Sequence, residues 1–357
     1  MKNYQVETRL LFADLLKIIF VFGVIISHIS GAQVKLLQHG SLYWWFANLY
    51  NTMGRPAVPI FVMISGMFLL DASKRDDMKT FWTKRFNKVI IPFIFWPIFY
   101  YFWMIYYRKP GNFIFYDFVK VIIKGNTTLR ENEHLWFLAM IIGIYLSAPI
   151  IKKFTDNASN KLQLYFLLVW FVFVSIKPAL HKFMGLDIGI YNTIFVNYIG
   201  YFVLGHYLHN IKLIHTKTIL TILSFIYVAS LVTSCIGNYY INLHTTKYDQ
   251  YFIDNFSPGI VLMSLSIFLI FKILCNKINI KNKFIESYSY LVFGIYLIHI
   301  IVLRYIDSSG LVYKYFRPLF ANPIVFIPSL AFFGMVISSF IILLMQNIPI
   351  IKRVVPK

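Results

Sequence analysis

Long apolar segments alternate with short polar ones along the whole chain. A transmembrane helix needs about 20 mostly apolar residues, because the hydrocarbon core of a bilayer is about 30 Å thick. About ten segments of near this length occur, and they cover residues 10–30, 56–71, 88–107, 134–151, 162–180, 190–208, 218–237, 257–275, 287–305 and 323–346. The pattern predicts an all-α fold, a polytopic membrane protein with about ten transmembrane helices in one bundle.

The same pattern predicts one transmembrane domain over residues 1–357, without a soluble extracytoplasmic domain. No linker rich in Ser and Pro and no acidic tail interrupts the alternation. The first apolar segment carries Asp14 and Lys17, which a cleaved signal peptide would not be expected to hold. We therefore expect it to be a retained span.

Composition agrees with a membrane protein, since 59% of the residues are hydrophobic and only 13% are charged. The net charge of +20 could indicate nucleic-acid binding, but the basic residues lie mainly between the apolar segments. With a cytoplasmic amino terminus, 20 of the 34 Lys and Arg fall in inner segments, 13 in outer segments and Lys17 within the first span. Because cytoplasmic loops carry an excess of basic residues, we expect both termini in the cytoplasm.

The first span contains three ionisable side chains, Asp14, Lys17 and His28. Such residues are costly inside a membrane and are therefore functional candidates. The eleven residues from Lys17 to His28 turn a helix by about 20° and rise roughly 16 Å, and Asp14 lies within about 40° of His28. One stripe of this helix is thus predicted to carry all three. The structural alternative is an Asp14–Lys17 ion pair and an interfacial histidine.

Three other spans carry polar residues that we expect at the depth of His28. Arg55 begins the second segment, where it could bind an anion or an oxyanion or extend towards lipid headgroups. His134 begins the fourth segment, and His299 follows Tyr296 by three residues in the ninth. The agreement in depth among four spans predicts a shared site.

Two further patterns are given structural interpretations. His206 and His209 are three residues apart, as metal or haem ligands on a helix could be, but no third ligand accompanies them, and we interpret them as interfacial histidines. We predict no metal site. Cys235 and Cys275 fall near opposite membrane faces, so no disulfide is predicted between them.

Five segments, taken in order, resemble the acyltransferase-3 family of integral membrane acyltransferases. They read ADLLKIIFVFGVIISH, RPAVPIFVMISGMFL, KRFNKVIIPFIFW, HLWFLAMIIGIYLSAPI and YLVFGIYLIHIIVL. The family's signature has an arginine followed, after ten intervening residues, by a histidine. His28 stands at the histidine position, whereas Lys17 replaces the arginine. A role that needs only positive charge is compatible with this change, but one that needs a guanidinium is not.

The resemblance implies O-acyl transfer, with acetyl favoured, from cytoplasmic acyl-CoA to an extracytoplasmic carbohydrate hydroxyl in a bacterial plasma membrane. His28 would act as general base, and Arg55 or His134 would stabilise the oxyanion. The acceptor would be a surface polysaccharide, peptidoglycan or a small glycolipid. Polysaccharide-synthesis proteins are possible partners.

A donor site is expected at the inner face. Lys84, Arg85 and Lys88 precede the third span and would attract the phosphates of coenzyme A, with Lys17 deeper along the same route. The alternative interpretation of these charges is that they only set the orientation of the chain.

Two other classes of protein fit the same pattern. An exporter of polysaccharide or of a lipid-linked sugar would also have about ten spans and intramembrane polar residues. A structural subunit of a polysaccharide synthase is the third possibility. His28 distinguishes them, because an acyltransferase needs a titrating base there and an exporter has no evident use for one.

Overall fold

The computed structural model describes residues 10–71, 77–108, 118–119, 134–190, 197–245, 247–276, 282–308 and 322–356. All regular elements in these ranges are helical, which confirms the all-α prediction. The α-helices are α1 (Leu11–Leu36), α2 (Leu42–Gly54), α3 (Ala57–Leu69), α4 (Met78–Arg85), α5 (Ile91–Arg108), α7 (Trp136–Asn157), α8 (Asn160–Phe171), α9 (Lys177–Met184), α10 (Ile199–Asn210), α11 (Thr216–Ile241), α12 (Pro258–Asn276), α13 (Lys283–Ser289), α14 (Val292–Ser308) and α15 (Pro323–Asn347).

Seven helical segments in the described ranges are long and apolar enough to cross a membrane, or eight if the bent pair α13–α14 is one span. This confirms a multi-pass membrane protein and roughly agrees with the prediction of about ten spans. The largest difference is at α10, which has 12 residues and is too short to cross a bilayer alone. Residues 191–196 of the corresponding predicted segment lie outside the described residues.

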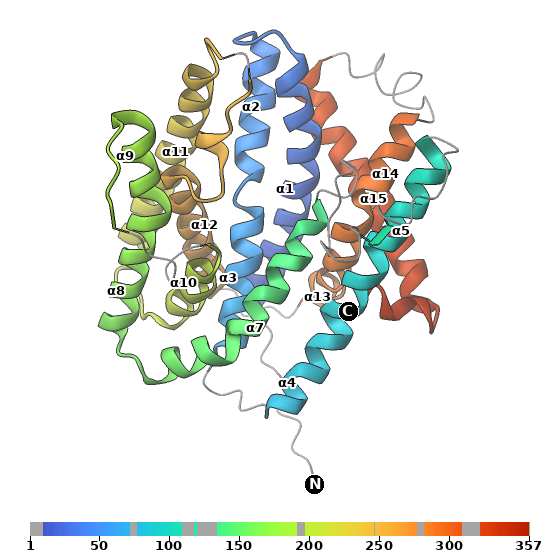
Figure 1. The fold of residues 1–357 in the computed structure, drawn as a ribbon, viewed down its shortest axis with the longest axis horizontal. Helices are drawn as coiled ribbons and strands as arrows, with labels where there is room; N and C mark the ends of the chain where they lie inside the picture. The colour runs from blue at the N-terminus through green and yellow to red at the C-terminus, as the bar shows by residue number, and fades with distance from the viewer. Residues whose placement is uncertain are drawn as a thin grey trace.

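Helix α1 is the central helix of the bundle. It packs against α2, α3, α12, α13, α14 and α15, and Figure 1 shows it beside α2 between two groups of helices. Of its ionisable residues, Asp14 is buried among these helices. We name the two ends of the bundle the Asp14 end and the Leu36 end, after residues near the two ends of α1.

Helix α11 shows how the outer helices meet lipid. Large apolar side chains are exposed along one face, at Ile222, Phe225, Val228, Val232, Ile236 and Tyr240. Small polar side chains on the other face are buried, at Ser230, Ser234, Asn238 and Asn242. Because the apolar side points outward, this helix is built for a lipid environment.

Helices α2 and α3 together form one candidate span from Leu42 to Leu69. This span was predicted to begin at residue 56, next to Arg55, whereas in the structure it begins at Leu42. Arg55 lies inside the span, at the break between two 13-residue helices. Hydropathy missed α2 because its residues Asn48, Asn51 and Thr52 are buried against protein, where lipid does not exclude polar side chains.

Glycine allows α1 and α2 to cross closely at this break. A Cβ on Gly54 would overlap the backbone oxygen of Gly23 and the hydroxyl of Ser27. The crossing fixes Arg55, which follows Gly54, beside the segment of α1 that carries His28.

Candidate functional site

Three histidines from distant parts of the chain form one cluster. His28 lies on α1, His134 stands two residues before the start of α7 and His299 lies on α14. The ring centroids are 5.3 Å apart between His28 and His299, 6.4 Å between His28 and His134, and 5.1 Å between His134 and His299. The structure thus brings together three of the four residues that were predicted at one depth. We call these three residues the imidazole cluster.

The members of the imidazole cluster differ in accessibility. His299 is fully buried and His134 is 5% exposed. His28 keeps an exposed side chain, although its neighbour Ile29 is buried. His28 lies roughly 12 Å along α1 from Leu36. It is therefore the most exposed of the three.

Two tyrosines fix the position of His134. The hydroxyl of Tyr296 donates to the backbone carbonyl of His134, and the ring of Tyr100 lies 5.2 Å from the imidazole. Tyr100 also donates to the carbonyl of Leu297 at 2.9 Å, which joins α5 to α14. Sequence reasoning missed Tyr100, because it stands in an aromatic run that resembles lipid-facing residues.

Arg55 is the fourth predicted residue, and it lies close enough to His28 to interact with it electrostatically. It interacts in the same way with Tyr248 and Asp254, in the loop that joins α11 to α12. Its Nε atom is buried and has no hydrogen-bond partner among the described residues. A buried N–H without a partner is unusual, so this donor is available to a bound group.

Two further polar residues near His28 were not predicted. Asn51 lies one turn before Arg55, is 1% exposed and packs against Gly31 of α1. Neither polar atom of its side-chain amide has a hydrogen-bond partner within the described parts of the chain. Arg304 of α14 also acts electrostatically on His28. An isolated Asn in a span is usually a contact between helices, so the sequence carried no signal for Asn51.

The ionisable residues at the Asp14 end are paired. Lys17 lies 3.2 Å from Asp14, which also accepts a hydrogen bond from Ser289 of α13 at 2.8 Å. The predicted structural alternative, an ion pair, is therefore present. The Lys17 side chain remains 28% exposed, and its ammonium group lies 5.5 Å from the centre of the Phe68 ring.

The predicted donor residues lie on α4 and the turn after it, away from the imidazole cluster. Lys84 and Lys88 are exposed, whereas Arg85 lies over the rings of Phe81 and Tyr145 at 5.3 and 5.7 Å. Figure 1 shows α4 at one edge of the bundle. Of these three basic residues, the two lysines are the more exposed.

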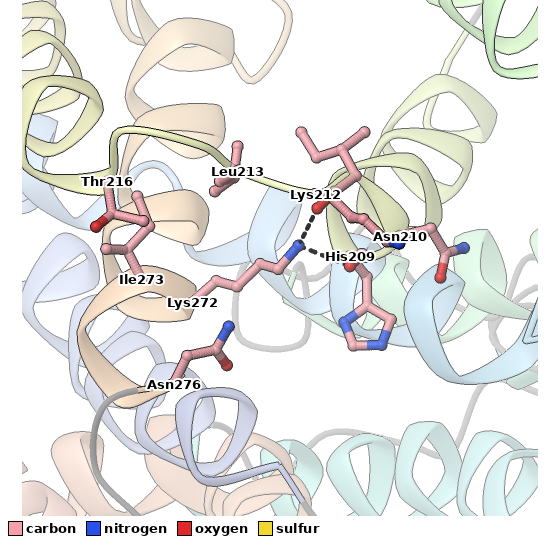
Figure 2. A pocket seen from close by; sticks show the side chains of 9 residues that line it. His209, Asn210, Lys212, Leu213, Thr216, Lys272, Ile273 and Asn276 are labelled. Carbon is pink, nitrogen blue, oxygen red and sulfur yellow. Dashed lines mark hydrogen bonds between the residues drawn. The ribbon is translucent and has the colours of Figure 1, made fainter.

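A pocket of about 440 Å³ opens beside α10 and α12 (Figure 2). Lys272 lies within it and donates to the carbonyls of Leu208, His209 and Ile211 at 2.8, 2.7 and 2.9 Å. These carbonyls close the carboxyl end of α10, where a cation is favourable. All three N–H groups of Lys272 are used, so the residue caps a helix.

The two histidines of α10 have local partners. His206 lies 3.1 Å from the amide of Asn210, and His209 stacks on Phe12. No group of three or more His, Cys, Asp or Glu side chains in the described ranges has an arrangement that could hold a metal ion. The imidazole cluster is held by ring contacts and by the hydrogen bonds of Tyr296 and His299 to backbone carbonyls.

Comparison with known families identifies the chain. The model of the acyltransferase-3 family, an acyltransferase domain, matches residues 10–344. Neither curated proteins nor solved structures gave a significant match. Because the match covers nearly the whole sequence, the chain belongs to this family of acyltransferases.

Proposed function

We propose that this membrane acyltransferase moves an acyl group, most simply acetyl, from cytoplasmic acyl-CoA to a hydroxyl of an extracytoplasmic carbohydrate. The observation that supports this best is the accessible His28 beside Arg55 and two buried histidines. A base next to a hydrogen-bond donor is the minimum that acyl transfer to a hydroxyl requires.

His28 acts as general base in this proposal. It takes the proton of the acceptor hydroxyl as the oxygen attacks the thioester carbonyl, which forms a tetrahedral oxyanion. Arg55, whose buried Nε–H has no partner among the described residues, stabilises that oxyanion, and His134 is the second candidate for this role. When the intermediate collapses, the C–S bond breaks and the proton passes from His28 to the departing CoA thiolate.

The donor enters from the Asp14 end, which we place at the cytoplasmic face of a bacterial plasma membrane. The exposed charges of Lys84 and Lys88 attract the CoA phosphates, and Lys17 lies further along the path. Arg85 contributes less, because it is stacked between two aromatic rings. A Cys at position 79, on α4, should then react only with a thiol reagent supplied from the cytoplasmic side, and labelling from outside would contradict this orientation.

Membership of an acyltransferase family favours this proposal over an exporter. Buried polar atoms of Arg55, Asn51 and His299 near His28 have no hydrogen-bond partner among the described residues. Such atoms are suited to bind a polar substrate, which supports a reaction at His28. Surface polysaccharide, peptidoglycan and small glycolipids are all candidate acceptors.

The test uses inverted membrane vesicles from cells that produce the protein. Radiolabelled acetyl-CoA is supplied outside the vesicles, at the former cytoplasmic face, and label in alkali-labile esters of luminal glycan is counted. We expect incorporation that depends on the protein and is lost in His28→Ala.

The matched control is His181→Ala, which removes an exposed histidine on α9. It should retain incorporation. Equal labelling with and without the protein, for both acetyl- and succinyl-CoA, would contradict the proposed function. Mass spectrometry of the surface glycan with and without the protein would then identify the acyl group.

A further inference from the structure

The orientation of His299 is fixed by its own helix. Its Nδ1 atom lies 2.6 Å from the backbone carbonyl of Tyr296. A carbonyl oxygen can only accept, so Nδ1 carries the proton and, in the neutral ring, Nε2 carries the lone pair. This Nε2 atom is buried and has no hydrogen-bond partner among the described residues. The fold thus holds an open acceptor inside the imidazole cluster.

His28 is the side chain that needs such an acceptor. A general base that takes a proton becomes an imidazolium with two N–H groups. One faces the reacting oxygen, and the other can donate to an acceptor within the protein. Two imidazoles joined by an N–H···N bond of about 3 Å have centroids about 5 Å apart, and His28 lies 5.3 Å from His299.

The positive charges around His28 make a hydrogen-bond acceptor for its protonated ring more important. Arg55 of the α2–α3 break and Arg304 of α14 both act electrostatically on His28, and both would oppose a positive charge on its ring. The ring contacts of His28 within the described residues are with His134 and His299. The bond from His299 to the carbonyl of Tyr296 defines where its lone pair lies.

We infer that His299 is a positioning residue, whose Nε2 atom accepts a hydrogen bond from His28 during acyl transfer. The bond selects the tautomer of His28 that presents its other nitrogen to the acceptor hydroxyl, and it stabilises the imidazolium that forms. His299 does not change protonation, since the proton moves from the hydroxyl to His28 and then to the CoA thiolate. The inference rests on the proposed function.

Three substitutions separate this role from a structural one. His299→Gln places an acceptor oxygen near the position of Nε2 but loses the donor to Tyr296. His299→Asn keeps a donor at the position of Nδ1 but loses the acceptor, and His299→Phe fills the space with neither. Acetyl transfer from acetyl-CoA in the vesicle assay gives apparent kcat and the KM for acetyl-CoA, and thermal unfolding in detergent gives stability.

We expect His299→Asn and His299→Phe to lower kcat by about 10-fold to 10²-fold, part of the usual contribution of a general base, with the KM unchanged. His299→Gln should stay within about fivefold of the parent, although it should unfold at a lower temperature than His299→Asn. His299→Gln is thus expected to be more active but less stable than His299→Asn. A merely structural role would instead make the more stable variant the more active one. The matched control is His206→Phe, at a buried histidine of α10, and it should keep kcat.

Equal kcat for His299→Phe and the parent would overturn the inference and leave the proposed function intact. The same holds if activity follows stability across the three variants. A parent protein without acetyl transfer would overturn the proposed function and this inference together.

Discussion

Replacing Gly54 with Ala should move the two sides of the site apart without changing the chemical identity of any reacting group. The new Cβ would fall about 1 Å inside the closest normal carbon–oxygen approach of about 3.3 Å, against the backbone oxygen of Gly23. It would also overlap the hydroxyl of Ser27, which can rotate, but the backbone cannot. The helices α1 and α2 must therefore move apart, and His28 and Arg55 move with them.

A displacement of about 1 Å can cost about 10²-fold in rate, and overpacking of this kind costs about 1–3 kcal/mol of stability. We expect Gly54→Ala to lower the rate of acetyl transfer by about 10²-fold, measured in the vesicle assay, and to lower the unfolding temperature in detergent. The control is Gly143→Ala on α7, where a Cβ would meet nothing within 4 Å. If both variants kept the parent rate, the close crossing of α1 and α2 would not be what positions Arg55.

Three further predictions concern separate parts of the molecule. His28→Ala should lower the rate by about 10²–10⁴-fold with acyl-CoA binding intact in a filter-binding assay, and a loss under tenfold would exclude His28 as the base. Lys84→Gln with Lys88→Gln should raise the KM for acetyl-CoA without a change in unfolding temperature, whereas Arg85→Gln should lower that temperature, because it loses two ring contacts. An unchanged KM in the lysine variant would mean that these charges only orient the chain. Lys272→Met should destabilise the protein by about 1–3 kcal/mol, the usual cost of leaving buried acceptors without a donor, measured by denaturant unfolding, and no measurable effect would show that the end of α10 does not depend on this cap.

The depth of the imidazole cluster could be predicted because each histidine interrupts an otherwise apolar segment. Position along such a segment gives height in the membrane, and His28, His134 and His299 do meet. Whether the three side chains point towards one another could not be predicted, because this depends on how α1, α7 and α14 are rotated about their axes in the bundle. The donor site, the acceptor and the side of the membrane on which each lies stay predictions.

The errors have a common physical origin in α2. Hydropathy detects lipid-facing helices, whereas α2 is largely enclosed by α1, α11 and α15. There Asn48 donates to the carbonyl of Cys235 at 3.0 Å and accepts from Asn238 at 2.7 Å. A helix with such contacts looks like a loop in the sequence, so Arg55 was placed at the start of a span and Asn51 was overlooked.

The position of Arg55 inside the span bears on the depth at which the proposed acyl transfer can occur. His28 lies roughly 16 Å from Lys17 and roughly 12 Å from Leu36 along α1, so the thioester and the hydroxyl must meet within the span. An arginine at the membrane face could not reach an oxyanion formed there. The helix break after Gly54 places the guanidinium at this depth, and the close crossing with α1 holds it beside His28. In this proposal the donor approaches His28 from one end of the bundle and the acceptor from the other, and the acyl group is transferred where they meet. Such a transfer requires no continuous channel through the protein. An exporter, by contrast, would need a path for its whole substrate.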